Sequence, residues 1–262
     1  MTQDGRTNIR GLILDMDGVL WRDNQPIGDL PGIFAQIEGR GWGVVLATNN
    51  ATSSITQYLD KLHGLGVDLR PEQVINSAQA AAHYLSQQHP QGGPVYLIGE
   101  DGLTQALEEK GFYFSDRDPL AVVVGMDRQF TYKKMTDGTR LIRAGVPFIG
   151  TNPDRTFPTP EGLIPGTGSI LAAIEAASYT KPVIVGKPAP EMYRVALERM
   201  VIEPSQCLVV GDRLETDIAG AQQIGCLTGL VLSGVTSPDA AKSWMPSPNW
   251  ICQDLTNLLN CL

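Results

Sequence analysis

The sequence predicts an α/β fold built around a mostly parallel sheet. Continuous apolar runs, such as residues 12–14 and 208–210, are typical of strands that are buried on both faces. Along the chain these runs alternate with segments that have helical patterns. The chain has 262 residues, of which 42% are hydrophobic and 18% charged, so it can form a large core in one or two domains.

The N-terminal part of the chain reads as alternating strands and helices. The expected elements are, in order, a strand at 12–14, a helix near 30–39, a strand at 43–47, a helix that runs from a cap at Thr52-Ser53-Ser54 to about His63, and an alanine-rich helix at about 77–88. The helix that ends near His63 is closed by Gly64 and Gly66.

A second α/β pattern begins after the turn-forming segment at residues 90–94. Its expected elements are strands at 95–98, 121–124 and 148–150 and helices at 103–110, 133–143 and 168–177. Because this series makes a complete small α/β unit, we expect a second domain at 79–182, inserted into a first domain formed by 1–78 and 183–262.

Composition excludes several classes of partner. A net charge of −8 gives no general attraction to nucleic acid or to an anionic membrane. No apolar stretch reaches the length of a transmembrane helix, and the first residues lack the apolar core of a signal peptide. The four cysteines have no Cys-x-x-Cys spacing, which disfavours a zinc site. We therefore expect a cytoplasmic protein with reduced thiols.

Two carboxylates, Asp15 and Asp17, follow the first strand, and Gly18 begins a turn after them. Strand residues two apart point to the same side, so both side chains can converge at the carboxyl end of the strand. Ligands of open parallel sheets bind at that end. Because two close carboxylates repel each other, this pair requires either a cation such as Mg²⁺ or a proton shared between them.

Three later segments place further polar groups after apolar strands. They are Thr48-Asn49-Asn50, Gly186-Lys187-Pro188, and the run from Gly211 to Asp217. Together with Asp15 and Asp17 they supply carboxylates, a hydroxyl, amides and one lysine, which is the set of groups needed to hold a phosphate beside a metal ion.

In this order, the four segments resemble the four motifs of the haloacid dehalogenase (HAD) superfamily, in the class IIA branch of NagD-like and p-nitrophenylphosphatase-like enzymes. The resemblance covers nearly the whole chain. It implies a Rossmann-like HAD core with a parallel sheet and an inserted α/β cap of the C2 type. It also implies Mg²⁺-dependent hydrolysis of phosphate monoesters through a covalent aspartyl phosphate.

The resemblance assigns roles to the first two motifs. Asp15 is expected to be the nucleophile, with its second oxygen on Mg²⁺. Asp17 is expected to act as general acid and then general base, and to offer its backbone carbonyl to the metal. Thr48 and the amide of Asn49 are expected to hold phosphoryl oxygens, while Asn50 either contacts the phosphate or only orients the loop.

The other two motifs supply charge. Lys187 is expected to neutralise the phosphoryl group and to orient Asp15, and Asp212 to be a ligand of Mg²⁺. Asp217 is expected to act through a water molecule on the metal or to hold Lys187. The motif assigns no role to Arg213.

Substrate choice is expected to depend on the cap. Asp127, Asn152 and Asp154 follow strands of the cap pattern and are candidate contacts to the substrate, with turn formation as the alternative for each. The Gly166-Thr167-Gly168 segment lacks the third glycine and the preceding strand of a nucleotide-binding loop. We expect a small phosphorylated metabolite as the substrate, and the resemblance further implies a homodimer that pairs through the cap.

Other chemistries fit the sequence less well. Cys207 and Arg213 have the Cys-x5-Arg spacing of cysteine phosphatases, but the residues between them read as a strand rather than a phosphate loop. No Gly-x-Ser-x-Gly elbow is present, which disfavours a serine hydrolase. Within the superfamily, Asp17 disfavours dehalogenase chemistry. A HAD phosphomutase and a non-catalytic protein that binds phosphorylated metabolites remain as alternatives.

Overall fold

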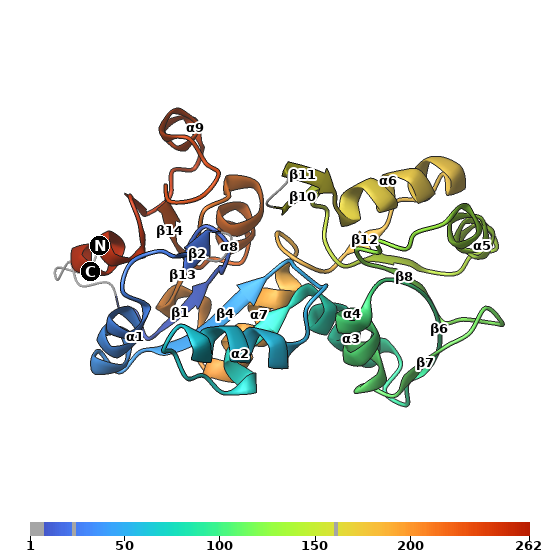
Figure 1. Cartoon of the computed structure of the whole chain (residues 1–262), viewed down its shortest axis with the longest axis horizontal. Helices are drawn as coiled ribbons and strands as arrows, with labels where there is room; N and C mark the ends of the chain where they lie inside the picture. The colour runs from blue at the N-terminus through green and yellow to red at the C-terminus, as the bar shows by residue number, and fades with distance from the viewer. Residues whose placement is uncertain (1–7, 23–24, 160–161) are drawn as a thin grey trace. The chain divides into compact units, whose positions relative to one another are not determined.

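Two parallel sheets organise the computed structural model, which describes residues 8–22, 25–159 and 162–262 (Figure 1). The chain divides into two compact units. The first unit comprises Met1–Thr48, Leu59–Ile75 and Tyr193–Leu262, and the second comprises Asn49–Tyr58 and Asn76–Met192. The two parallel sheets and their flanking helices confirm the expected α/β class.

The first unit is built on a six-stranded parallel sheet with the order β15-β14-β13-β1-β4-β5. Its strands are β1 (Gly11–Leu14), β4 (Gly43–Thr48), β5 (Val74–Asn76), β13 (Cys207–Gly211), β14 (Leu227–Val231) and β15 (Trp250–Cys252). Segments from both ends of the chain are interleaved in this sheet, with the blue β1 and β4 beside the orange β13 and β14 (Figure 1). Every residue of the central strand β1 is buried, as its uninterrupted apolar sequence predicts.

Strand register brings the polar segments of the first unit to the same edge of the sheet. Leu14 of β1 pairs with Val210 of β13 on one side and with Leu46 of β4 on the other. The residues that follow Leu14 and Val210 therefore emerge together, and these residues include Asp15 and Asp212.

The remaining elements of the first unit are helical or short. The longer helices that begin or end in it are α1 (Leu30–Gly39), α2 (Ile55–Gly64), α7 (Pro190–Met200) and α10 (Leu255–Cys261). The shorter elements are α8 (Ala219–Gln223), α9 (Pro238–Ser243), a π-helical turn at Leu214–Ile218, 3₁₀ turns at Pro71–Gln73 and Pro204–Gln206, and the hairpin of β2 (Trp21–Arg22) with β3 (Gln25–Pro26).

The second unit contains a five-stranded parallel sheet with the order β12-β9-β8-β6-β7. Its strands are β6 (Gly93–Ile98), β7 (Phe112–Phe114), β8 (Val122–Val124), β9 (Phe148–Gly150) and β12 (Val183–Ile184), with an antiparallel pair of β10 (Thr156–Thr159) and β11 (Gly162–Pro165). Its helices are α3 (Ser77–Gln88), α4 (Asp101–Glu108), α5 (Tyr132–Arg143) and α6 (Thr167–Ser178).

Both faces of the second sheet are covered by apolar side chains, and β8 shows how. Val123 packs in one core cluster with residues of α3 and α4. Its neighbours Val122 and Val124 pack in another cluster with residues of α5 and α6. Because successive side chains of a strand point to opposite faces of the sheet, three consecutive valines can pack in two core clusters.

Strand β12 lies directly after the expected domain boundary. The domain boundary expected at 182–183 would place this strand in the catalytic core, but β12 pairs in parallel with β9 and extends the second sheet. Ile184 packs against one core cluster of the second unit and Val185 lies in the other. A short apolar run fits an edge of either sheet, so the pattern alone does not say which sheet it joins. The limits of the cap as a functional domain remain a prediction.

Helix length in the described part of the chain bears on membrane insertion. None of the described helices combines the length and the apolar composition that crossing a bilayer would require.

Candidate active site

Asp15 is held at the carboxyl end of β1 by the sheet itself. Its backbone N–H donates to the carbonyl of Val210 at 2.9 Å, which continues the ladder between β1 and β13. The residue is only 8% exposed. A carboxyl group with so little access to water is costly to ionise unless its surroundings offer positive charge or hydrogen-bond donors.

Asp212 directly follows β13 and lies in a space that two glycines leave open. The backbone N–H of Val235 donates to its Oδ2 at 2.7 Å. A Cβ atom at Gly234 would overlap this same oxygen, and a Cβ at Gly18 would lie 2.6 Å from it. Gly18 also has a φ of +81°, which side-chain-bearing residues rarely adopt. Both glycines are therefore required for the position of the Asp212 carboxylate.

Asp217 is carried by the π-helical turn at Leu214–Ile218, a geometry that occurs often at functional sites. The N–H of Arg213 donates to its Oδ2 at 3.1 Å, and a Cβ at Gly211 would overlap its carboxyl group. From the neighbouring helix α7, the hydroxyl of Tyr193 donates to the carbonyls of Thr216 at 2.9 Å and of Asp217 at 3.2 Å. The turn is thus fixed from both sides.

Burial raises the pKa of Tyr193 well above its usual value, and the negative charges of Asp217 and Asp15 raise it further. The phenol therefore keeps its proton and remains a donor to the π-helical turn at neutral pH.

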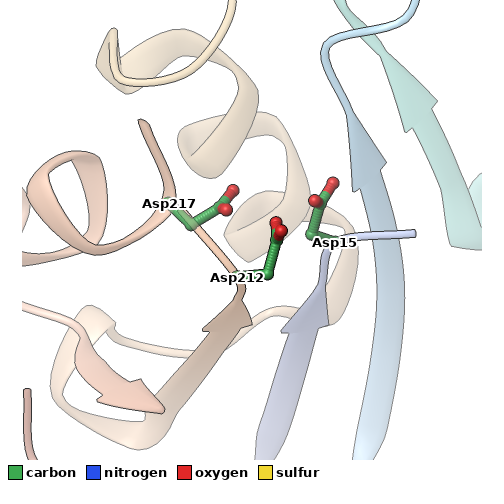
Figure 2. A group of neighbouring side chains, drawn as sticks. All are labelled: Asp15, Asp212 and Asp217. Atoms are coloured by element: carbon green, nitrogen blue, oxygen red, sulfur yellow. The ribbon is translucent and has the colours of Figure 1, made fainter. Parts of the chain in front are cut away.

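The three carboxylates meet at one point (Figure 2). One oxygen each from Asp15, Asp212 and Asp217 can be chosen so that all lie within 4.8 Å of one another, and all three residues are buried. Buried like charges at this spacing favour a cation among them. The donor set consists of carboxylate oxygens, which suits a hard divalent cation such as Mg²⁺. These residues could therefore hold the expected metal ion.

Asp17 lies outside this cluster. Its residue is exposed, and its Oδ1 accepts a hydrogen bond of 2.9 Å from the indole Nε1–H of Trp21. The two carboxylates of the first motif thus have different environments, although they are only two residues apart. Only Asp15 joins the acidic cluster.

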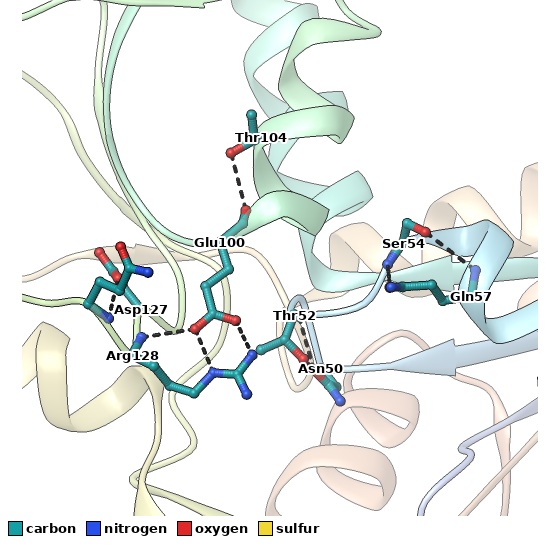
Figure 3. A network of polar contacts seen from close by, with 9 residues as sticks. Asn50, Thr52, Ser54, Gln57, Glu100, Thr104, Asp127 and Arg128 are labelled. Carbon is teal, nitrogen blue, oxygen red and sulfur yellow. Dashed lines mark hydrogen bonds and ion pairs between the residues drawn. The ribbon is translucent and has the colours of Figure 1, made fainter.

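The second motif is divided between the units. Thr48 is the last residue of β4 and is buried in the first unit, whereas Asn49 begins the second. The Asn49 carbonyl accepts hydrogen bonds from Ser77 Oγ at 2.6 Å and from Asn152 Nδ2 at 2.8 Å. The Oδ1 of Asn50 accepts from the N–H and the hydroxyl of Thr52, as Figure 3 shows. These bonds orient the loop after β4, and contact of Asn50 with a phosphate remains a prediction.

Lys187 belongs to the second unit and is 3% exposed. Its backbone carbonyl accepts a hydrogen bond of 3.0 Å from Asn49 Nδ2, which also donates to Asp154 Oδ2 at 3.2 Å. Within the second unit, the side chain of the second motif therefore fixes the loop of the third. The action of Lys187 on Asp15 remains a prediction, because these residues lie in different units.

The candidate cap contacts have bonding roles inside the second unit. Asp127 Oδ2 pairs with Lys134 Nζ at 2.6 Å, and its Oδ1 accepts from the N–H of Gln129 at 2.8 Å. Asn152 Oδ1 accepts from the N–H of Asp154 at 3.1 Å, in the turn after β9. The bonds that Asp127 Oδ1 and Asn152 Oδ1 accept from the N–H two residues further on are of the turn-forming kind. Direct contact of the three side chains with a substrate remains a prediction.

The cysteine-phosphatase alternative does not fit the structure. Cys207 is the first residue of β13, at the opposite end of that strand from Asp212, and it is fully buried. A hydrogen bond with the Cys226 thiol, together with burial, raises the pKa of Cys207 far above its usual range. Since only the thiolate is a nucleophile, Cys207 is an inert core residue.

Sequence reasoning missed three contributors to this site: Trp21, Tyr193 and the Gly234-Val235 pair. A signal for the last was present in the Ser-Gly pair at 233–234, which marks a turn after an apolar run, and glycine often allows a close approach to the backbone. Trp21 and Tyr193 carried no such signal. A buried aromatic residue in an apolar pattern reads as part of a core.

Comparisons with known proteins agree with this geometry. A family described as haloacid dehalogenase-like hydrolase matches residues 12–113, and a second HAD-like hydrolase family matches residues 184–258. A dihydroxyacetone phosphatase of Corynebacterium glutamicum is 33% identical over 249 residues, covering 95% of this chain and 90% of that protein.

Two solved structures extend the comparison to the fold. NagD from E. coli K-12 has 35% identity and a TM-score of 0.88, and the match covers 94% of this chain and 97% of that one. A p-nitrophenyl phosphatase from Archaeoglobus fulgidus has 29% identity and a TM-score of 0.91, covering 97% and 99%. The chain therefore belongs to the haloacid dehalogenase-like hydrolases, in the class IIA branch of NagD-like phosphatases.

Proposed function

We propose that the protein hydrolyses small-molecule phosphate monoesters through an aspartyl-phosphate intermediate on Asp15. The observation that carries this proposal is the meeting of three buried carboxylates, Asp15, Asp212 and Asp217, at the carboxyl ends of β1 and β13. A cluster of this kind costs folding free energy, so its presence calls for a cation. Phosphoryl transfer is a reaction in which such a cation neutralises developing charge.

The first step forms a bond between an Asp15 carboxylate oxygen and phosphorus, while the bond from phosphorus to the ester oxygen breaks. Asp17 donates a proton to the departing alkoxide. Asp17 then takes a proton from water, which attacks the phosphorus of the aspartyl phosphate and releases inorganic phosphate and free Asp15. When bound, Mg²⁺ supplies electrostatic stabilisation of the phosphoryl oxygens.

Residues of the other motifs are proposed to bind the phosphoryl group. Thr48 and the amide of Asn49 hold its oxygens, and Lys187 neutralises part of its charge. Asp212 would hold the metal ion together with Asp15 and the backbone carbonyl of Asp17, while Asp217 would act through a water molecule on the metal or hold Lys187. These assignments are supported by the family and by the burial of Thr48 and Lys187.

The substrate class is proposed from the cap and from the relatives. A cap that restricts access favours small metabolites over phosphoproteins as substrates, and the second unit is proposed as that cap. The match to a dihydroxyacetone phosphatase makes triose phosphates and related sugar phosphates the first compounds to test. A homodimer that pairs through the cap is also proposed, and the molar mass measured by light scattering would test it.

The test is hydrolysis of p-nitrophenyl phosphate with Mg²⁺, with EDTA and with beryllofluoride, which mimics a phosphoryl group on an aspartate. We expect metal-dependent turnover that beryllofluoride blocks and that falls by about 10⁴-fold or more in Asp15→Asn. The matched control is Asp239→Asn, since this side chain is almost fully exposed on α9. Full turnover in Asp15→Asn would refute the covalent mechanism.

Product analysis separates the remaining alternatives. Release of inorganic phosphate in step with the alcohol is expected for a phosphatase. Transfer of the phosphoryl group to another position of the substrate would indicate a phosphomutase. Tight binding of phosphorylated metabolites without turnover of any would indicate a binding protein.

A further inference from the structure

A hydrogen bond in the first motif has no part in the mechanism described so far. The indole Nε1–H of Trp21 donates to Oδ1 of Asp17 at 2.9 Å. Trp21 is 1% exposed, whereas Asp17 is an exposed residue. The only polar group of a fully buried ring thus donates a hydrogen bond to the carboxylate that is proposed to transfer protons. Buried indole N–H groups need a partner, but many other acceptors would serve.

The local backbone explains why these two side chains meet. In the tight turn after β1, the N–H of Leu20 donates to the carbonyl of Met16 at 2.8 Å, and the N–H of Gly18 donates to the carbonyl of Trp21 at 2.7 Å. The chain therefore curls back, and Trp21 is brought beside Asp17. Gly18 permits this turn through its positive φ.

The ring of Trp21 is itself held in place. Nζ of Lys61, on α2, lies 4.0 Å from the ring centroid, which is within the range of a cation–π interaction. The rest of the side chain is packed in the core of the first unit. An indole fixed by packing and by a cation is a rigid donor, so its hydrogen bond selects one orientation of the Asp17 carboxylate.

We infer that Trp21 is a positioning residue for proton transfer by Asp17. The inference rests on the proposed function, in which Asp17 is the acid and base. An exposed aspartate samples several rotamers, and only some of them direct an oxygen at the leaving group. Because Oδ1 accepts the hydrogen bond from Trp21, Oδ2 is the oxygen that carries the transferred proton. Misplacement of a catalytic group by about 1 Å can cost on the order of 100-fold in rate.

The experiment compares two substrates that differ in the need for an acid. The p-nitrophenolate ion leaves without protonation, whereas the phenolate ion of phenyl phosphate is a poorer leaving group and benefits from a proton. Their rings have nearly the same shape, so binding changes should affect both. Since kcat/KM includes only the steps up to the first irreversible one, it reports on formation of the aspartyl phosphate.

In Trp21→Phe we expect kcat/KM for phenyl phosphate to fall by about tenfold or more, and that for p-nitrophenyl phosphate to fall by less than about threefold. Asp17→Asn should show the same selectivity with larger losses. Trp42→Phe is the matched control, because Trp42 also has a cation over its ring, Arg40 at 4.8 Å, but has no part in the first motif. Its two kcat/KM values should both stay near the wild-type values.

Equal losses for the two substrates in Trp21→Phe would overturn the inference, since a merely structural role affects both alike. Unchanged values for both would overturn it as well. Failure of the proposed function gives a different result from failure of this inference. In that case the wild-type protein would lack metal-dependent hydrolysis, or Asp15→Asn would retain it.

A second measurement leaves the buried ring intact. The chain has four tryptophans, and their indole N–H resonances can be followed by NMR in protein labelled with ¹⁵N. In Asp17→Ala the Trp21 resonance should move upfield as its acceptor is lost, while the Trp42 resonance should stay in place. An unmoved Trp21 resonance would contradict the hydrogen bond on which the inference rests.

Discussion

Acidic side chains lie near the carboxyl ends of parallel strands in both units, but their neighbours differ. In the first unit, three buried carboxylates face one another within 4.8 Å. In the second unit, Glu100 pairs with Arg128 at 2.6 Å, as Figure 3 shows. Asp127 pairs with Lys134 at the same distance. The ion pairs of the second unit link loops to neighbouring segments. In the first unit, the close approach of three buried carboxylates favours the binding of a divalent cation.

The pKa of Glu100 reflects this pairing. Hydrogen bonds from the side chain of Arg128 lower the pKa of Glu100 below its usual value, more than burial raises it. Its carboxylate is therefore already balanced within the second unit. A metal ion has no comparable reason to bind there.

The largest effect should come from filling the space beside Asp212. In Gly234→Ala the added methyl group would overlap Oδ2 of Asp212, so the carboxylate must move. We expect phosphatase activity to fall by at least about 100-fold, which is within the range for disturbed metal sites. Steady-state hydrolysis at several Mg²⁺ concentrations measures this loss.

The control for that variant is Gly39→Ala at the end of α1, where an added Cβ would contact nothing within 4 Å. Its activity should stay within about twofold of wild type. If Gly234→Ala is as active as Gly39→Ala, the close fit around Asp212 has no bearing on catalysis.

In the second unit, the corresponding change is Asp127→Asn. It leaves Lys134 without its ionic partner, and the pair is half-buried, so we expect a loss of about 2 kcal/mol in the free energy of unfolding. Urea denaturation at pH 7 measures this change. Replacing both residues, with Asp127→Asn and Lys134→Met together, should recover much of the loss. A loss of the same size in the double variant would show that the pair is not the source.

A smaller effect is expected from Tyr193→Phe. The variant removes the two hydrogen bonds to the carbonyls of Thr216 and Asp217, and we expect the free energy of unfolding to fall by about 1–2 kcal/mol. Chemical denaturation at pH 7 gives this value. Because the hydroxyl donates to backbone carbonyls and not to the clustered carboxylates themselves, the loss of activity should be less than in Gly234→Ala.

The raised pKa of Tyr193 gives a pH dependence with a definite sign. The folded protein retains the phenol proton at a pH where the unfolded chain, with its ordinary tyrosine pKa near 10, releases it. Stability must therefore fall as the pH rises above about 10. In Tyr193→Phe this alkaline loss should be smaller than in wild type. An equal loss in both proteins would show that other groups control it.

The smallest effect concerns backbone strain outside both sets of carboxylates. Val201 follows α7 with a φ of 54°, a conformation that is unfavourable for a β-branched residue, and it is 84% exposed. We expect Val201→Gly to raise the free energy of unfolding by about 0.5–1 kcal/mol, because relief of strain exceeds the added entropy of the unfolded chain. A destabilised variant, measured by urea denaturation, would contradict this expectation.

The sequence predicts the fold and the site best where local chemistry requires a particular kind of residue. The apolar runs before Asp15 and Asp212 predict buried strands, and parallel pairing then forces the two carboxylates to one edge of the sheet. The helix expected near 30–39 and the alanine-rich helix expected at about 77–88 are confirmed as α1 and α3.

Other features depend on tertiary contacts, which the local sequence pattern does not determine. The run at 183–185 could extend either sheet, and only packing against α6 and β9 decides for the second. The donor from Trp21 to Asp17 depends on the path of a tight turn. The partners of Asp127, Asn152 and Asp154 likewise required coordinates, since an exposed turn and a substrate contact use the same residue types.

The central claim is that the three carboxylates of the first unit bind a divalent cation. The most direct measurement is the melting temperature of the protein across an Mg²⁺ titration, for wild type, Asp212→Asn and Asp127→Asn. We predict that Mg²⁺ raises the melting temperature of wild type and of Asp127→Asn, but not that of Asp212→Asn. Without metal, Asp212→Asn should melt above wild type, since one of three repelling charges is gone. If Mg²⁺ leaves the melting temperature of wild type unchanged, or shifts it equally in all three proteins, the three carboxylates do not bind the cation.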